Sequence, residues 1–141
     1  MIYLDTNVIV YAIENHPKYG KRCKLVLEAI ASGKLEAASS VMVLVELINV
    51  LKKMNKELKK LRDVRLDVGL NISAVESLPI TWLDLGLPII ERAARYDYPV
   101  NAIDYIHLAT MELNQITSIV SADKDLDKAG WLERTDPLDY R

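Results

Sequence analysis

The sequence has a single cysteine, Cys23, and so it cannot form an internal disulfide bond. Only 5 of its 141 residues are glycine and 5 are proline, while 50% are hydrophobic, which is the opposite of a disordered composition. A chain of this length buries roughly 68% of the surface that its unfolded state exposes, so a core can form without disulfides or a structural metal. We therefore expect one compact domain over residues 1–141 and exclude the disulfide-stapled class of small proteins.

Segments that would direct the chain to a membrane or out of the cell are also lacking. No apolar run approaches the roughly 20 residues that cross a bilayer, and the longest, 41–45, ends at Glu46. The first residues have no basic stretch ahead of their apolar side chains, so we expect a cytoplasmic protein that does not contact membranes. The net charge of −2 argues against a protein that coats nucleic acid by bulk charge.

Short apolar segments alternate with helical patterns along the whole chain. Strands are expected at residues 2–4, 35–38, 77–81, 118–121 and 133–135. Helices are expected at residues 8–13, 19–31, 41–55, 56–68, 88–95, 101–114 and 124–129, with Gly69 ending the fourth of them. This alternation predicts an α/β fold, a short parallel β-sheet flanked by helices on both faces, in which function usually lies at the carboxyl ends of the strands.

Glu46 is the only charged residue in residues 41–51, a segment that is apolar on nearly every helical face. This pattern predicts a largely buried helix, in which an unpaired carboxylate would be costly or would lose its charge. Glu46 therefore points outwards at a sheet edge, pairs with a buried Lys or Arg, or belongs to a functional site. Asn49 shares its helical face and is a candidate hydrogen-bond partner.

Three aspartates add to this observation. Asp5 and Asp123 follow expected strands, and Asp104 lies in the first turn of a helix that Asn101 would cap. Each aspartate alone is explained as a helix cap, but together with Glu46 they could all face one cleft. Several carboxylates in one cleft need a cation among them, and oxygen ligands alone select Mg²⁺ or Mn²⁺. The chemistry that this indicates is attack of metal-activated water on a phosphodiester.

Four short motifs, in this order and in a chain of this size, resemble those of the PIN-domain nucleases, particularly the VapC-type toxins of prokaryotic toxin–antitoxin pairs. They are Leu4-Asp5-Thr6-Asn7, Glu46 in an apolar helix, Asn101-Ala102-Ile103-Asp104 and Ser121-Ala122-Asp123. The resemblance covers almost the whole chain and implies a metal-dependent endoribonuclease. The catalytic, metal-binding residues that it implies are Asp5, Glu46, Asp104 and Asp123, with Thr6, Asn7 and Ser121 as polar support. The family's last motif often continues to a second Asp and an aromatic residue. Here Asp125 is present but Leu126 replaces the aromatic residue, which leaves the role of Asp125 open.

The resemblance also implies an RNA substrate and a small antitoxin that occupies the acidic cleft. The apolar helices at 41–51 and 88–94 carry more apolar surface than one small sheet covers, which predicts a homodimer. Two other functions stay open, a PIN domain in RNA processing and a catalytically silent binding module with acidic helix caps. An aspartyl-phosphate phosphatase would need a second Asp where Asn7 stands.

One basic cluster, interspersed with acidic residues, occupies residues 52–65. It consists of Lys52, Lys53, Lys56, Lys59, Lys60, Arg62 and Arg65. Such a run is either a solvated helix face with internal ion pairs or a contact for an RNA backbone or an acidic partner. The histidines, His16 and His107, lack metal-ligand spacing, and we interpret them as a loop and a core residue.

Overall fold

The structure is a computed structural model that describes residues 1–61 and 65–141. Five short parallel strands form one sheet in the order β3-β2-β1-β4-β5. In spatial order these strands are β3 (Ile80–Leu83), β2 (Ala37–Ser40), β1 (Ile2–Leu4), β4 (Ser118–Val120) and β5 (Glu133–Thr135). The predicted parallel α/β fold is therefore confirmed, with the first strand of the chain at the centre of the sheet.

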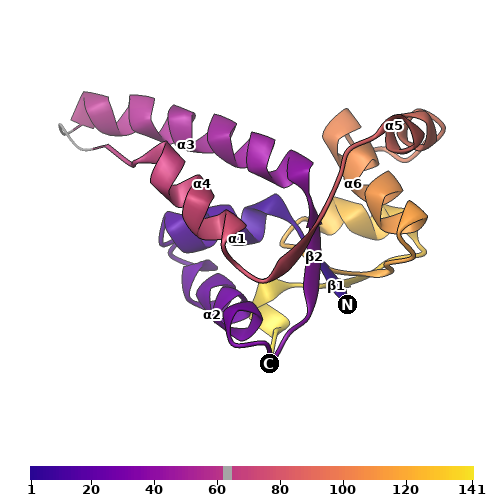
Figure 1. Ribbon diagram of the computed structural model, residues 1–141, viewed down its shortest axis with the longest axis horizontal. Coiled ribbons are helices and arrows are strands. Elements are labelled where there is room, and N and C mark those ends of the chain that lie inside the picture. The colour runs from indigo at the N-terminus through magenta and orange to yellow at the C-terminus, as the bar shows by residue number, and fades with distance from the viewer. Residues whose placement is uncertain (62–64) are drawn as a thin grey trace.

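Helices cover both faces of the sheet (Figure 1). One face carries α1 (Thr6–Ile13), α2 (Gly20–Ala31), α3 (Val41–Leu61) and α4 (Val68–Glu76). The other carries α5 (Leu87–Ala93), α6 (Ala102–Leu113) and the short 3-10 helix η1 (Lys124–Ala129). A second 3-10 helix, η2 (Pro137–Asp139), follows β5 and contacts α2.

Two hydrophobic cores lie on the two faces because successive side chains of a strand point to opposite sides. Leu4 of β1 is buried with Val8 and Leu47 on the face of α1 and α3. Its neighbour Tyr3 is buried with Leu108 and Met111 of α6 on the other face. Both cores meet at β1, so the residues that directly follow this strand are held from both sides.

Some element boundaries differ from those predicted. Strands β2 and β3 begin at Ala37 and Ile80, a few residues later than expected. Helix α4 was not predicted, because Gly69 was interpreted as a helix end. Instead, Asp67 caps the start of α4 by accepting a hydrogen bond from the Leu70 amide at 2.9 Å, and Gly69 lies inside the first turn. Part of the helix expected at 56–68, residues 62–64 including Arg62 of the basic cluster, lies outside the described residues.

Helix α3 is less buried than its apolar sequence predicts. Val43, Leu47 and Leu51 form a buried stripe, but Val45 and Ile48 are 58% and 38% exposed. Asn49 is exposed as well, and the hydrogen bonds of Glu46 are made with Thr6 and His107 rather than with the candidate partner Asn49. The prediction of a largely buried helix is also wrong, because α1 and α4 cover α3 on one side only. Across the described ranges, the structure has no helix with the length and apolar character needed to span a bilayer.

Candidate active site

Four acidic side chains line one cavity of about 270 Å³ at the carboxyl ends of the central strands. Asp5 directly follows β1, and Asp123 lies just beyond β4. Glu46 comes from the second turn of α3 and Asp104 from the first turn of α6. The structure thus brings together all four carboxylates that the sequence singled out, from four separate elements.

Asp5 is held by hydrogen bonds from three neighbours. It caps α1, where its Oδ1 accepts a hydrogen bond from the Thr6 amide at 2.8 Å. Its Oδ2 accepts from Ser121 Oγ at 2.6 Å and from Asn7 Nδ2 at 3.3 Å. Burial raises the pKa of this carboxyl, while the charge of His107 and these hydrogen bonds oppose the rise. The side chain is therefore fixed in place and its ionised form is only partly stabilised.

Asn7 and Ser121 tie the ends of β1 and β4 together. Asn7 Nδ2 donates to Ser121 Oγ at 3.1 Å, and Asn7 Oδ1 accepts from the Ala122 amide at 3.2 Å. Ser121 Oγ also accepts from the Asp123 amide at 3.0 Å. The polar residues suggested as support for the acidic set thus fix the backbone on which Asp5 and Asp123 stand.

Glu46 is held by a chain of hydrogen bonds that the sequence did not predict. Its Oε1 accepts from Thr6 Oγ1 at 2.9 Å and lies 2.6 Å from Nε2 of His107. The other ring nitrogen of His107, Nδ1, is 2.6 Å from the hydroxyl of Tyr3. His107 is only 3% exposed, so its interpretation as a core residue is right about burial, but it missed this contact.

The charge state of this chain follows from its surroundings. Burial lowers the pKa of His107, but the hydrogen bond to Glu46 and the charges of Asp5, Glu46 and Asp104 outweigh that effect, and the net pKa is raised. Burial, and then the charge of Asp5, raise the pKa of Tyr3 well above its ordinary value. Tyr3 therefore stays a neutral phenol, and the neighbouring carboxylates favour the protonated form of His107.

Asp123 also caps a helix, as the alternative interpretation proposed, whereas Asp104 lies in the first turn of a helix that Asn101 caps. Asn101 Oδ1 accepts from the Asp104 amide at 2.9 Å, and Asp123 Oδ1 accepts from the Asp125 amide at 3.0 Å. Asp104 nevertheless lines the acidic cavity. Burial, followed by the charges of Asp123 and Asp5, raises its pKa to about 6. Asp123 therefore caps a helix and also belongs to the carboxylate cluster.

Asp125 lies outside this cavity. Its side chain is 65% exposed and is 3.2 Å from Lys128 Nζ. It lines a neighbouring hollow together with Asn7, Tyr11 and Asp123. Asp123 lines both hollows, so Asp125 is adjacent to the acidic cavity without lining it.

The donor set fits a hard divalent cation. All four candidate ligands offer carboxylate oxygens, the ligands that Mg²⁺ and Mn²⁺ prefer. The raised pKa of Asp104 reflects its burial and then the like charges of Asp123 and Asp5. Within residues 1–61 and 65–141, no three acidic, His or Cys side chains are already gathered as a closed metal cage. Closure around an ion would therefore require side-chain rotation within the cavity.

We predict that His107→Leu weakens binding of Mn²⁺ about 10- to 100-fold, because Glu46 loses the hydrogen bond that orients it. The substitution also leaves the buried Tyr3 hydroxyl without its partner and should destabilise the fold by about 1–3 kcal/mol. Calorimetric titration with Mn²⁺ measures the first effect and thermal unfolding the second. Tyr3→Phe keeps the ring and the contact between His107 and Glu46, so it should weaken Mn²⁺ binding less. Unchanged Mn²⁺ affinity in folded His107→Leu would argue against a positioning role.

A parallel sheet whose two central strands end in clustered carboxylates places the chain among α/β proteins with an acidic cleft. The family model described as PIN domain matches residues 2–132. The chain belongs to the PIN domain family. No curated protein sequence gives a significant match.

Three solved structures of similar fold each cover nearly the whole chain. A toxin–antitoxin complex from Klebsiella pneumoniae has 21% identity and a TM-score of 0.64, covering 97% of this chain and 98% of that one. VapC20 of Mycobacterium tuberculosis, described as a sarcin–ricin-loop-cleaving toxin, has 19% identity and a TM-score of 0.71, with 94% and 98% coverage. VapBC-1 of nontypeable Haemophilus influenzae has 19% identity and a TM-score of 0.64, with 98% and 99% coverage. At these identities the similarity establishes the fold.

Proposed function

We propose that this protein is a metal-dependent endoribonuclease and the toxin of a toxin–antitoxin pair. The observation that carries the proposal is the meeting of Asp5, Glu46, Asp104 and Asp123 in one cavity at the ends of the central strands. Membership of the PIN domain family supports the nuclease chemistry, and the toxin–antitoxin proteins of similar fold support the biological role.

The four carboxylates would hold Mg²⁺ or Mn²⁺, which supplies a water of lowered pKa and neutralises charge on the phosphate. Asp5 is pre-oriented by Thr6 and Ser121, and Glu46 by Thr6 and His107. His107 has both ring nitrogens engaged, by Glu46 and by Tyr3. It is therefore placed to orient a ligand rather than to activate a side-chain nucleophile, which favours direct attack of water with no covalent intermediate.

Cleavage of RNA by purified protein, freed of any bound partner, tests this function. With Mn²⁺ and a panel of structured RNAs, the protein should cut at least one RNA internally. Excess EDTA should stop the reaction and added Mn²⁺ should restore it. A protein that cuts no RNA, and whose thermal stability does not respond to Mn²⁺ or Mg²⁺, would instead be a silent binding module.

An antitoxin is the partner that this function requires, because an unchecked ribonuclease would harm its own cell. One of the structures of similar fold, from Klebsiella pneumoniae, is described as a toxin–antitoxin complex. A cavity lined by four carboxylates would accept an Arg or Lys side chain of the partner in place of the metal ion. We place both proteins in the cytoplasm, where the RNA is. Purification from the native operon should therefore yield a small second protein.

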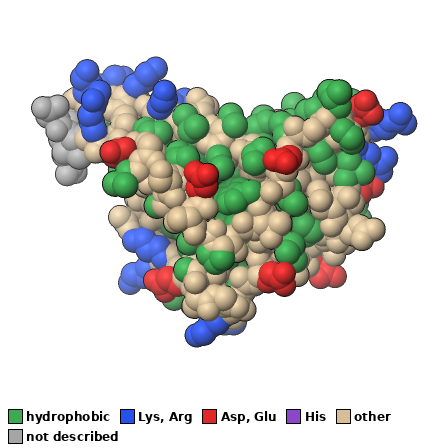
Figure 2. Space-filling model, viewed as in Figure 1, with side chains coloured by type: hydrophobic (Ala, Val, Ile, Leu, Met, Phe, Trp, Pro, Cys, Tyr) green, Lys and Arg blue, Asp and Glu red, His purple; other side chains and the backbone are tan. Residues whose placement is uncertain are grey.

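We also propose that the protein is a homodimer, because apolar side chains lie exposed on three helices. They are Val45 and Ile48 of α3, Leu87 and Ile90 of α5 and Leu113 of α6, with exposed fractions of 58%, 38%, 74%, 42% and 47%. Figure 2 shows hydrophobic side chains gathered along the upper side of the molecule, over the region where Figure 1 places α5 and α6. Such a patch on a small chain favours self-association through a two-fold interface.

Light scattering at micromolar concentration should give twice the 16.0 kDa mass of one chain. Val45→Glu puts a charge into the exposed apolar patch and should yield the monomer without loss of folding, because this side chain is 58% exposed. The matched control is Leu70→Glu on α4, which is 68% exposed and should leave the dimer intact. A wild-type mass of one chain would exclude the dimer.

A further inference from the structure

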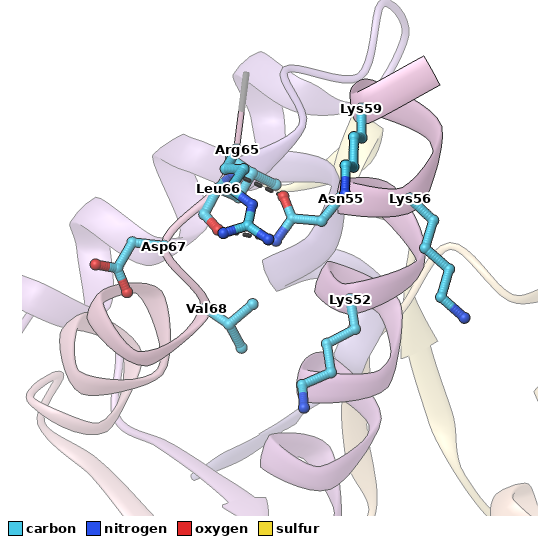
Figure 3. A pocket seen from close by; sticks show the side chains of 8 residues that line it. All are labelled: Lys52, Asn55, Lys56, Lys59, Arg65, Leu66, Asp67 and Val68. Atoms are coloured by element: carbon cyan, nitrogen blue, oxygen red, sulfur yellow. Dashed lines mark hydrogen bonds between the residues drawn. The ribbon is translucent and has the colours of Figure 1, made fainter. Parts of the chain in front are cut away.

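A second, larger hollow lies between the second half of α3 and the start of α4, as Figure 3 shows. Its volume is about 690 Å³. Four cationic side chains line it, together with a single carboxylate. These are Lys52, Lys56, Lys59, Arg65 and Asp67. We call this hollow the basic groove.

The walls of the basic groove are held by specific hydrogen bonds. Asn55 of α3 accepts from the Leu66 amide at 2.7 Å through Oδ1 and donates to the Leu66 carbonyl at 2.9 Å through Nδ2. These two bonds fix the segment that carries Arg65 beside α3, as Figure 3 shows. Asp67 is engaged as the cap of α4 through the Leu70 amide. These hydrogen bonds therefore hold the two walls of the groove, α3 and the segment that leads into α4, next to each other.

Positive charge is concentrated here in a chain whose net charge is −2. Among the described residues of the second half of α3, the one salt bridge joins Lys60 to Glu57 at 4.0 Å, on side chains about three-quarters exposed, and it uses no lining cation. Figure 2 shows Lys and Arg side chains gathered at this end of the molecule. A cluster of exposed cations attracts a polyanion, and attraction of that kind is absent from the acidic cavity.

The basic groove is separate from the acidic cavity. Lys52 and Lys59 lie six and thirteen residues after Glu46 on the same helix, which is roughly 9 and 20 Å along its axis. At 3.6 residues per turn, Lys52 and Lys59 lie about 120° and 140° around α3 from Glu46. The cations of the groove and the carboxylates of the cavity therefore lie on different faces of α3.

We propose that the basic groove binds the phosphate backbone of a folded RNA at a distance from the bond that is cut, a proposal that rests on the ribonuclease function above. Among the described residues that line it, three of the four cations are lysines and none is aromatic. Lysine acts as a point charge that suits phosphates, whereas protein interfaces are depleted of lysine and enriched in aromatic residues. Contacts of this kind position a nucleic acid without reading its sequence. They would select a substrate by its size and fold.

The test compares two double variants of equal charge, K56Q/K59Q in the groove and K21Q/K34Q on the far exposed surface near α2. Glutamine keeps helix propensity, and both pairs of lysines are exposed, so both variants should unfold at the wild-type temperature. Filter binding to labelled bulk tRNA is measured in EDTA, which prevents cleavage, over roughly 50 to 200 mM KCl. We expect K56Q/K59Q to bind at least about tenfold more weakly and to reduce the salt slope by roughly 1.5, while K21Q/K34Q matches wild type.

Equal affinity and salt slope for the two variants would overturn the proposal. So would retained tRNA binding by K56Q/K59Q together with loss of its binding to the antitoxin, which would assign the groove to the protein partner. The result is distinguishable from failure of the ribonuclease function, because the binding assay contains no metal ion. If groove-dependent binding is found but wild-type protein with Mn²⁺ cuts no RNA, the groove stands and the nuclease proposal fails.

Discussion

Asp5→Asn should reduce metal-dependent RNA cleavage at least about 100-fold while the protein remains folded. Asparagine is as good a helix cap as aspartate, and its oxygen can still accept the hydrogen bond from the Thr6 amide. The new amide group in place of Oδ2 cannot accept from Ser121 Oγ or from Asn7 Nδ2, so these two hydrogen bonds are lost. The substitution therefore removes one negative charge from the cavity together with these two bonds, and thermal unfolding checks that the variant is folded. Cleavage of the same RNA by both proteins at saturating Mn²⁺ measures the effect.

The matched control is Asp125→Asn, which removes the same charge from the neighbouring hollow. The Asp125 side chain contacts Lys128 on the surface. The hydrogen bond from the Asp125 backbone amide to Asp123 Oδ1 is unaffected by the change. We expect cleavage within about twofold of wild type, because exposed ion pairs contribute little. Equal loss of activity in both variants would mean that the catalytic set is not limited to the four carboxylates and includes Asp125.

Asp104→Asn should stabilise the metal-free protein at neutral pH, although it should abolish cleavage. Burial and the charges of Asp123 and Asp5 raise the pKa of Asp104 to about 6, so the ionised form is disfavoured in the folded state. After allowance for solvent screening, its neutral replacement should add about 1 kcal/mol of stability above pH 6, roughly 3 °C in melting temperature. The gain should shrink as the pH falls through 6, because wild-type Asp104 then takes up a proton itself.

Added Mn²⁺ should make the wild-type protein more stable than Asp104→Asn, the reverse of their order without metal. An ion present at about 100 times its dissociation constant stabilises the wild-type fold by about 2.7 kcal/mol, and Asp104→Asn should lose most of this gain. Thermal unfolding of both proteins, with EDTA and then with increasing Mn²⁺, gives the comparison. If Mn²⁺ shifts both melting temperatures equally, the ion binds elsewhere on the chain.

The acidic set could be predicted from the sequence because each of its members breaks a local pattern. Glu46 interrupts an apolar helix, while Asp5 and Asp123 follow short apolar strands. Parallel strands that end at one edge then bring such residues together. The contact between Glu46 and His107 carried no such signal. The two residues are 61 positions apart, and a histidine on the apolar face of a helix looks like any core residue.

The surface of α3 could not be predicted, because apolar periodicity does not reveal what covers a helix. Val45 and Ile48 have the same local pattern as the buried Leu47, yet they are exposed. The basic groove depends on the hydrogen bonds between Asn55 of α3 and Leu66, which precedes α4, a pairing 11 positions apart that no helix or strand propensity encodes. The lysines of α3 line a groove only because the fold places residues 65–68 opposite them.

The position of a bound metal ion tests the central claim most directly. Anomalous diffraction from crystals of the wild-type protein grown with Mn²⁺ locates the ion independently of any assay of activity. We predict a peak inside the acidic cavity, about 2.0 to 2.2 Å from oxygens of Asp5 and of at least one other member of the set Glu46, Asp104 and Asp123. A peak elsewhere on the chain, or an empty cavity at saturating Mn²⁺, would contradict the account.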